Sequence, residues 1–302
     1  MKEWLEYAAV WVILKLFGAL PRGVARWIAV RVARTLLGLV PGLKRVALFN
    51  LGVAFPDWTD DQKLKTVRKM TRYLAWQAVE FARFPHYNEK NIFEWIKLEG
   101  NENFLEAKNR GKGVLFLTGH IGAWEFSSFA HALYGHPLHY MARHLDNSKI
   151  DALVNSYRSR SGSSPIYKDE SARHMLKVLR AGGTIGILAD QNTMPQEGVF
   201  VDFFGTQACT TAGIARVALH TDAAVVPAYA YWNEHAHEYK LRFLPALELI
   251  RTGDINKDVF ENTQNFAKVT EAIIRSLPEQ WTWIHARWKT RPDGEAPLYK
   301  FL

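Results

Sequence analysis

The stretch Val114-Leu115-Phe116-Leu117-Thr118-Gly119-His120-Ile121-Gly122-Ala123-Trp124-Glu125 joins an apolar run to the start of a helical pattern. Four consecutive apolar residues predict a buried strand, and the two glycines that follow leave the backbone free to turn. We therefore place His120 in the turn and Glu125 in the first or second turn of the helix. A carboxylate near an imidazole orients the ring and raises its basicity, as a general base for a hydroxyl requires. A histidine after a strand also occurs in purely structural roles.

The same alternation of strand and helix continues along the chain from about residue 103. It predicts an α/β fold with a single mixed, mostly parallel sheet covered by helices, the mixing lying near the sheet edge. No linker rich in Pro, Gly or Ser divides this part, so we expect one catalytic domain over residues 55–302. The expected strands cover 114–117, 138–142, 185–188, 225–231 and 239–244, and the expected helices 123–133, 150–160, 171–180, 211–220 and 260–276.

The composition is that of a globular protein with an excess of positive charge. Of 302 residues, 48% are hydrophobic and 23% charged, which excludes a disordered or collagen-like chain. The single cysteine, Cys209, excludes an intramolecular disulfide and suits a reducing compartment. A net charge of +8 together with eleven tryptophans suits a nucleic acid or an anionic membrane surface as partner.

Most of that charge lies in the first 54 residues, which carry eight basic and two acidic side chains within an apolar sequence. The stretch 4–20 is shorter than the ~20 residues of a membrane-spanning helix and contains Glu6 and Lys15. The stretch 21–39 places arginines at helical spacings among apolar residues, as in a helix that lies in the headgroup layer. We predict that residues 1–54 form membrane-anchoring helices; the alternative is an amphipathic helix pair packed on the protein's own core. A nucleic-acid partner is disfavoured because the charge accompanies a contiguous apolar segment.

The spacing from His120 to Glu125 resembles the His-x4-Asp/Glu signature of the lysophospholipid acyltransferase superfamily. The form with glutamate, together with several later segments, resembles the bacterial lipid A late acyltransferases, which transfer lauroyl and myristoyl groups. Gln191 departs from this pattern, because some lipid A enzymes carry a histidine there. Related enzymes acylate other lipids, so the resemblance supports the reaction class more firmly than the acceptor. The segments that carry it are 143–147, 157–162, 190–192, 198–205, 208–211 and 279–292.

The resemblance implies a glycerol-phosphate acyltransferase-like fold, His120 as general base, Glu125 as its partner, and Arg158 and Asp190 as further active-site residues. A guanidinium such as that of Arg158 pairs well with a phosphate or a thioester oxygen, although it also occurs as an exposed helix cation. Asp190 ends an apolar strand, where α/β sheets place functional residues, although it also suits a capping role. Arg143 is a second candidate for anion contact. Asp202 is an alternative acidic site residue within what also resembles a turn.

The implied activity is direct transfer of a fatty acyl group from a thioester, on acyl carrier protein or acyl-CoA, to a hydroxyl of a membrane glycolipid such as a lipid A precursor. No cofactor or metal is implied. The implied location is the bacterial cytoplasmic (inner) membrane, with the catalytic domain on its cytoplasmic face. We expect the basic residues Arg287, Lys289 and Arg291 to dock the acidic carrier. Aromatic residues available for an acyl slot, or for core packing, are Trp124, Phe126, Phe129, Phe203 and Phe204.

Other classes of site fit the sequence less well. A serine hydrolase is disfavoured because no Gly-x-Ser-x-Gly elbow is present, and a zinc hydrolase because His-Glu-x-x-His is absent. His235 and His237 fit a surface turn better than a ligand pair, and Cys209 fits burial better than acyl transfer. Gly111-Lys112-Gly113 precedes a strand, so it is no phosphate loop. A non-catalytic, basic peripheral membrane protein remains an alternative.

Overall fold

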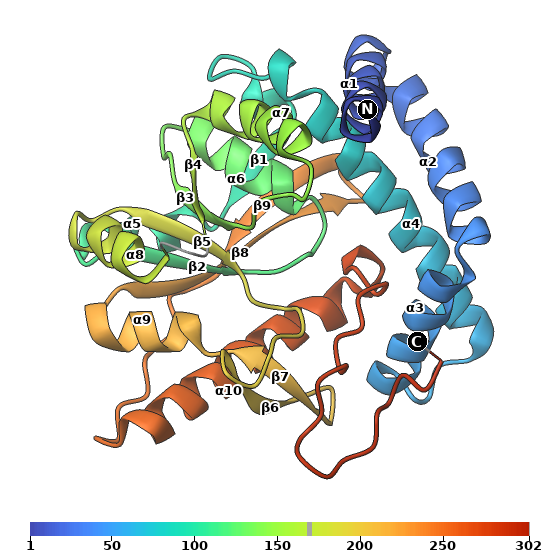
Figure 1. Ribbon diagram of the computed structural model, residues 1–302. Helices are drawn as coiled ribbons and strands as arrows, with labels where there is room; N and C mark the ends of the chain where they lie inside the picture. The colour runs from blue at the N-terminus through green and yellow to red at the C-terminus, as the bar shows by residue number, and fades with distance from the viewer. Residues whose placement is uncertain (168–170, 302) are drawn as a thin grey trace.

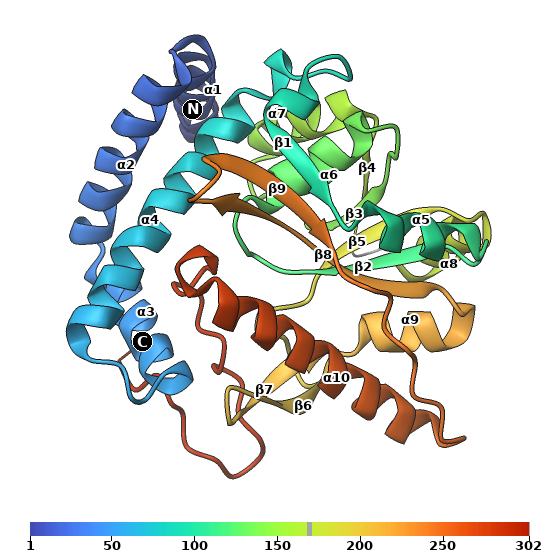
Figure 2. The same ribbon diagram turned by 180° about the vertical axis from the view of Figure 1, so that it is seen from behind.

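The computed structural model describes residues 1–167 and 171–301, and within them the chain builds a seven-stranded sheet in the order β1-β9-β8-β2-β5-β3-β4 (Figures 1 and 2). Strands β8, β2, β5, β3 and β4 run parallel, whereas β9 is antiparallel to β8 and parallel to β1. This confirms the predicted mixed, mostly parallel sheet. The strands are β1 Ile96–Glu99, β2 Val114–Thr118, β3 His139–Ala142, β4 Ser164–Tyr167, β5 Thr184–Leu188, β8 Ala224–Asn233 and β9 Glu238–Phe243.

Helices cover both faces of the sheet, because its central strands are apolar on both sides. In β2, Phe116 packs into the cluster beneath α5 and α6, whereas Leu115 and Leu117 pack into the cluster with α8, α9 and α10. A separate antiparallel hairpin of β6 (Gly198–Phe203) and β7 (Thr206–Thr211) lies beside α10 (Figure 2). The covering helices are α5 Asn101–Asn109, α6 Trp124–Leu133, α7 Ser148–Arg158, α8 Ser171–Arg180, α9 Gly213–Thr221 and α10 Ile255–Ser276.

Four helices precede the sheet: α1 (Lys2–Ala19), α2 (Arg22–Leu39), α3 (Pro41–Ala54) and α4 (Asp60–Ala82). Helix α4 lies in a stretch for which the sequence analysis gave no element. It begins at a capping box in which the side chains of Thr59 and Gln62 each accept a bond from the other's backbone N–H. Helices α1, α2 and α3 pack along α4, which in turn contacts α6 (Figure 1).

A buried carboxylate joins α2 to α4. Glu80 has a fully buried side chain and accepts hydrogen bonds from Arg22 Nε (2.9 Å), Arg26 Nη2 (2.6 Å) and the Tyr87 hydroxyl (2.5 Å). Burial alone raises the pKa of Glu80, but the two guanidinium groups outweigh it and hold this pKa below the ordinary value. The carboxylate is therefore ionised, and the inner face of α2 is fixed to the rest of the chain.

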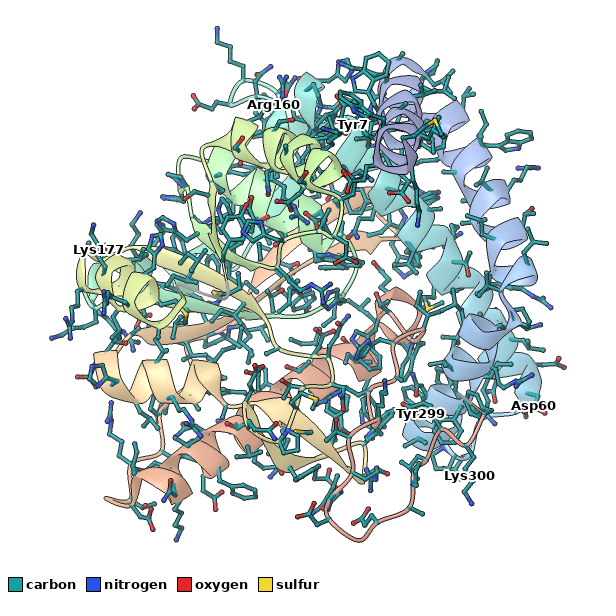
Figure 3. All side chains as sticks on the ribbon, viewed as in Figure 1. Tyr7, Asp60, Arg160, Lys177, Tyr299 and Lys300 are labelled. Carbon is teal, nitrogen blue, oxygen red and sulfur yellow. The ribbon has the colours of Figure 1, made fainter. Side chains whose placement is uncertain are left out.

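Helix α3 is fixed by the C-terminal segment. The Asn50 side chain donates to the carbonyl oxygens of Trp283 and His285, both at 2.7 Å, and accepts from the Tyr299 hydroxyl at 2.6 Å. Figure 3 shows Tyr299 lying against this helix. The first and last parts of the chain thus stabilise each other.

The outer faces of α1, α2 and α3 carry apolar side chains with no cover. Within the described residues no single helix is both long and apolar enough to cross a bilayer, and α2 and α3 meet that test only together, as a pair bent by 92°. The exposed large apolar side chains here are Trp4, Leu5, Trp11, Val12, Ile13, Leu16, Val24, Trp27, Val32, Leu36, Leu39, Val40 and Leu43.

The Glu80 contacts predict a large loss of stability on Glu80→Ala, because two arginines then lose their buried counter-charge. We expect the free energy of unfolding in urea to fall by about 3–5 kcal/mol. Glu106→Ala, which removes an exposed ion pair with Arg110, is the control and should cost less than about 1 kcal/mol. If the alanine variant does not fold, Glu80→Gln tests the same charge. A loss from either Glu80 variant as small as that of Glu106→Ala would contradict this role.

Candidate active site

The site forms where parallel strands β2 and β5 end. The two strands pair in register up to Thr118 and Leu188, and the Ala189 N–H still donates to the Thr118 carbonyl at 3.0 Å. Their carboxyl ends therefore bring the loop 119–123 and Asp190 together at one edge of the sheet. This is the edge at which open α/β sheets bind their ligands.

Asp190 holds His120 through two hydrogen bonds. The backbone N–H of His120 donates to Oδ2 at 2.8 Å, and its ring Nδ1 lies 2.9 Å from Oδ1. Because the carboxylate can only accept, the proton of the neutral ring is on Nδ1, which leaves Nε2 as a free base. The Trp281 indole also donates to Asp190 Oδ2, at 2.7 Å, so the 2%-exposed carboxylate has three donors.

Two glycines allow this close approach. A Cβ on Gly119 would lie 2.9 Å from the Asp190 carboxyl carbon, and a Cβ on Gly122, whose φ is +56°, would lie 2.1 Å from the Ala230 carbonyl oxygen. The segment 280–282 then closes over the loop, because Thr282 donates to the His120 carbonyl and Gln280 accepts from the Gly122 N–H. The loop is therefore fixed on three sides.

The interaction between His120 and Asp190 favours the charged form of both side chains. Burial lowers the pKa of His120, but the Asp190 charge and hydrogen bond outweigh it, so the net pKa lies above that of an ordinary histidine. Burial raises the pKa of Asp190, but His120 and the Trp281 N–H outweigh this and hold it below the ordinary value. The pair thus combines an ionised carboxylate with a more basic imidazole.

Glu125 makes a different contact from the one that the sequence predicted. Its carboxylate accepts from Arg158 through both oxygens, with Nε at 2.9 Å from Oε2 and Nη2 on Oε1. Helix α6 begins at Trp124, so Glu125 lies in the first turn and points to the end of α7, where Arg158 lies. The carboxylate that hydrogen-bonds to the His120 ring is therefore Asp190, whereas Glu125 acts on this ring only through its charge, which raises the pKa of His120. The role of Glu125 as partner of the base stays a prediction.

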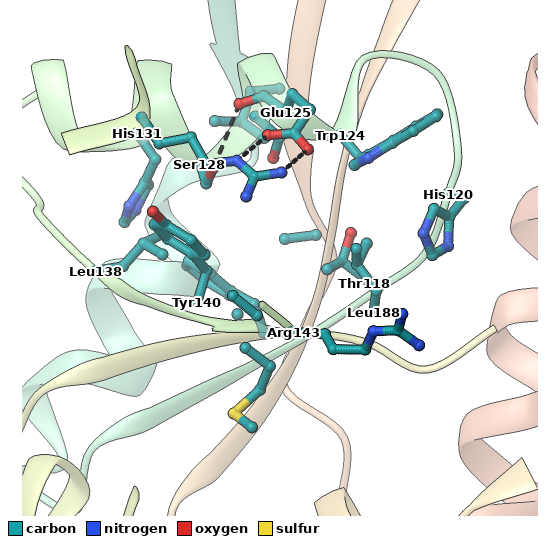
Figure 4. A pocket seen from close by; sticks show the side chains of 18 of the residues that line it. Thr118, His120, Trp124, Glu125, Ser128, His131, Leu138, Tyr140, Arg143 and Leu188 are labelled. Atoms are coloured by element: carbon teal, nitrogen blue, oxygen red, sulfur yellow. Dashed lines mark hydrogen bonds and ion pairs between the residues drawn. The ribbon is translucent and has the colours of Figure 1, made fainter. Parts of the chain in front are cut away.

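A cavity of about 230 Å³ opens beside His120 and runs along the face of the sheet that α6 covers (Figure 4). Glu125 and Arg158 line its wall, and Figure 4 shows His120 and His131 on opposite sides of it. Arg143 also lines the cavity; its side chain is 80% exposed and donates to Asp146 at 3.2 Å. The inner wall is largely apolar, from Phe116, Leu138, Met141, Leu188, Leu241 and Phe243.

Among the predicted acyl-slot aromatics, Trp124 lines the cavity, and Phe126 and Phe129 are buried in the core beside it. Phe203 and Phe204 instead pack against Trp281 and Trp283 in a different core cluster, so they line no part of the cavity. The hairpin that carries them sits on the other side of the sheet from α6, which sequence spacing alone did not reveal.

The predicted docking surface for a carrier protein needs one correction. Arg287 is 1% exposed and donates to the Cys209 and Gln191 carbonyl oxygens and to the Thr210 hydroxyl. It is therefore an interior residue that ties β7 to the loop after β5. Lys289 is exposed, and Arg291 is partly buried against the Gln207 carbonyl and Glu295.

The remaining candidates lie away from the cavity. Asp202 is exposed at the end of β6 and accepts from the Gly205 N–H, as expected of a turn. Cys209 is buried, and His235 and His237 lie in the exposed turn between β8 and β9. The described part of the chain holds no cluster of three or more His, Cys, Asp or Glu side chains placed for a metal ion.

Three residues of the site were not predicted from the sequence. Trp281 belongs to the C-terminal segment that carries part of the resemblance, but no local pattern indicated that its indole reaches Asp190. Tyr140 and His131 also line the cavity. They occur in an ordinary strand and an ordinary helix, so only the tertiary fold reveals them.

Comparison with known proteins places the whole chain in one family. Residues 1–290 match the family described as bacterial lipid A biosynthesis acyltransferase. A lipid A biosynthesis lauroyltransferase of Escherichia coli is 26% identical over 98% of this chain and 94% of its own length. A palmitoleoyltransferase of the same pathway and organism is 25% identical over 99% of this chain and 95% of its length. A lipid A biosynthesis acyltransferase of Haemophilus influenzae is 26% identical over 82% of this chain and 76% of its length. The chain therefore belongs to the bacterial lipid A biosynthesis acyltransferase family.

Proposed function

We propose that this protein transfers a fatty acyl group from a thioester to a hydroxyl of a lipid A precursor, with His120 as general base. The observation that carries the proposal is the His120–Asp190 pair, whose free Nε2 stands beside an apolar cavity. Family membership supports the reaction class and the lipid acceptor. A thioester on acyl carrier protein is the proposed donor, and acyl-CoA is the alternative.

In the proposed reaction, His120 Nε2 takes the proton of the acceptor hydroxyl as that oxygen attacks the thioester carbonyl carbon. The tetrahedral intermediate collapses, the carbon–sulfur bond breaks, and the thiolate takes the proton back from the imidazolium. Asp190 stabilises the imidazolium through its bond to Nδ1. Ester and thiol are the products, and no acyl-enzyme is formed.

We propose that the Arg158 guanidinium stabilises the negative charge that develops on the thioester carbonyl oxygen. Glu125 holds its guanidinium through two bonds, so the group is oriented before the substrate binds. The developing negative charge on the carbonyl oxygen is stabilised by this group or by backbone N–H groups at the start of α6. Arg143, exposed at the cavity wall, is the proposed contact for a phosphate of the donor arm or of the acceptor.

The cavity is the proposed site for the acyl chain. Gly186 of β5 is in register between Phe116 of β2 and Tyr140 of β3, and all three line the cavity. In-register neighbours project to the same face, so the missing side chain of Gly186 leaves space between two aromatic rings. The size of the side chain at position 186 should therefore affect which acyl chain lengths fit in the cavity.

Residues 1–54 are the proposed membrane anchor, with 55–302 as the catalytic domain on the cytoplasmic face of the inner membrane. The uncovered apolar side chains of α1 and α2 alternate with exposed basic ones such as Arg31 and Arg34. Such a surface suits a helix layer lying in the headgroup region of an anionic membrane. The fixed packing of α2 on Glu80 then holds the catalytic domain at the lipid surface.

The proposal predicts loss of transfer on His120→Ala. Purified enzyme, acyl carrier protein loaded with a fatty acid, and a lipid A precursor are incubated, and the product is measured by mass spectrometry. We expect at least a roughly 100-fold lower rate with unchanged circular dichroism, because general-base catalysis is lost. His220→Ala, on the exposed side of α9, is the control and should keep the wild-type rate. Equal rates in the two variants, or a covalent acyl-protein in burst kinetics, would refute the mechanism.

The His120–Asp190 bond predicts the pH dependence. Because His120 must be neutral to act, kcat/KM rises with pH through a midpoint above the ~6.5 of an ordinary histidine. Asp190→Asn removes the charge that raises this pKa, so the midpoint moves to lower pH while the plateau falls roughly 100-fold. Glu125→Gln should move the midpoint less, since Glu125 has the weaker effect on His120. The opposite order of the two shifts would count against the assignment.

Gly186→Leu should shorten the preferred acyl chain by filling the space between Phe116 and Tyr140. Donors of ten to sixteen carbons are compared in competition, and we expect the ratio of rates to shift at least about tenfold toward shorter chains. Gly213→Ala is the control, because its Cβ would meet only Thr211 Oγ1, at an ordinary 3.5 Å. An unchanged length preference in the leucine variant would mean that the chain binds elsewhere.

A further inference from the structure

Among the residues that the structure describes, the cavity contains three buried polar atoms for which none of them supplies a hydrogen-bond partner: both ring nitrogens of His131 and the hydroxyl of Tyr140. His131 is 1% exposed, and both residues line the cavity. Buried polar groups are normally paired, because an unpaired one costs about 1–3 kcal/mol. Two such residues in one cavity indicate that a ligand supplies the missing partners.

The protonation states of His131 and Tyr140 limit which chemical groups can pair with them. Burial lowers the pKa of His131 to about 3, so the ring is neutral and offers one donor and one acceptor. Burial raises the pKa of Tyr140 to about 12, so its hydroxyl keeps its proton. The nearby Arg158 guanidinium, 5.6 Å from the Tyr140 ring centroid, is already paired with Glu125. Lys108, whose ammonium group lies 3.4 Å from His136 Nδ1, and His136 itself lower the pKa of His131 further. The neutral ring and the neutral hydroxyl fit an uncharged group that both donates and accepts.

The side chains around His131 indicate what kind of ligand carries this polar group. The His131 ring makes edge contacts with Phe104 and Phe116, at centroid distances of 4.7 and 5.0 Å, and lies 5.5 Å from Phe243. These walls are apolar, so the occupant needs a hydrocarbon body with a polar substituent. Figure 4 shows His131 and Tyr140 on the side of the cavity away from His120. The substituent is thus carried on the part of the chain beyond the carbonyl that reacts at His120.

We propose that His131 and Tyr140 form a subsite for a hydroxyl group on the distal part of the bound acyl chain. This inference rests on one part of the proposed function, namely that the cavity binds the acyl chain. A hydroxyl can donate to the unprotonated ring nitrogen of His131 or accept from the protonated one, and it can accept from the Tyr140 hydroxyl as well. A hydroxylated chain then satisfies atoms that an unsubstituted chain of the same length leaves unpaired, and such sites discriminate strongly against the analogue that lacks the group.

The test measures direct binding to the full-length protein. Fatty acids of ten to sixteen carbons are titrated calorimetrically, each unsubstituted, hydroxylated next to the carboxyl end, or hydroxylated at the far end. We expect the far-end hydroxyl to tighten binding of at least one length about tenfold or more relative to both other forms. His131→Phe and Tyr140→Phe should each reduce that ratio toward one. Tyr134→Phe, whose hydroxyl donates to the Ile96 carbonyl outside the cavity, is the control and should keep it.

The outcomes separate this inference from the proposed function. Because the two substitutions remove atoms without protein partners, they should leave the melting temperature unchanged or raise it. Equal binding of hydroxylated and unsubstituted chains, with a lower melting temperature in the variants, would overturn the inference and indicate that ordered water pairs these atoms. If no fatty acid binds at all, the cavity is not the acyl site, which overturns both the inference and that part of the proposed function.

Discussion

The site depends on the hydrogen bonds that the buried Asp190 carboxylate accepts. This carboxylate has three donors, two from His120 and one from Trp281, and they come from the loop after β2 and from the C-terminal segment. A buried charge is stable only when its hydrogen bonds are complete, so these segments must meet at one point. A Cβ at position 119 would collide with this carboxylate, so only glycine fits there. The geometry of the base is therefore set by the same contacts that close the fold.

Two carboxylates in the candidate site have different partners. Asp190 is bound to an imidazole and can respond to a proton moving through the ring. Glu125 is bound through both oxygens to Arg158, a group that stays charged at any working pH. One pair is suited to moving a proton and the other to holding a fixed positive charge. The proposed transfer needs both, a base for the proton of the acceptor hydroxyl and a positive charge near the oxyanion that forms on the thioester carbonyl oxygen.

Sequence patterns predicted most of the sheet and the position of His120. The apolar runs expected at 114–117, 185–188 and 225–231 are local signals, and the structure has a strand at each, namely β2, β5 and β8. The contact between His120 and Asp190 was not predictable, because it depends on strands 70 residues apart pairing in register. Glu125 was expected as the partner because the spacing from His120 resembles the His-x4-Asp/Glu signature, yet in the first turn of α6 its carboxylate contacts Arg158.

The same limit explains the other corrections. Arg287 looked like a surface cation, but the interior carbonyl oxygens that it binds come from Gln191 and Cys209, far away in the sequence. Helix α4 has a capping box at Thr59 that a local search would have found, whereas the burial of its Glu80 depends on arginines more than 50 residues earlier. Polar residues in the interior are placed by partners that are distant in sequence, and local periodicity carries no information about them.

In the proposed mechanism, Asp190 and not Glu125 orients the His120 ring. The direct measurement is ¹⁵N NMR of the His120 ring in the wild type and in the Asp190→Asn and Glu125→Gln variants. The account predicts a neutral ring protonated at Nδ1 in the wild type, an unchanged tautomer in Glu125→Gln, and a lower pKa in Asp190→Asn. A ring protonated at Nε2, or a titration that responds to Glu125→Gln and not to Asp190→Asn, would contradict it.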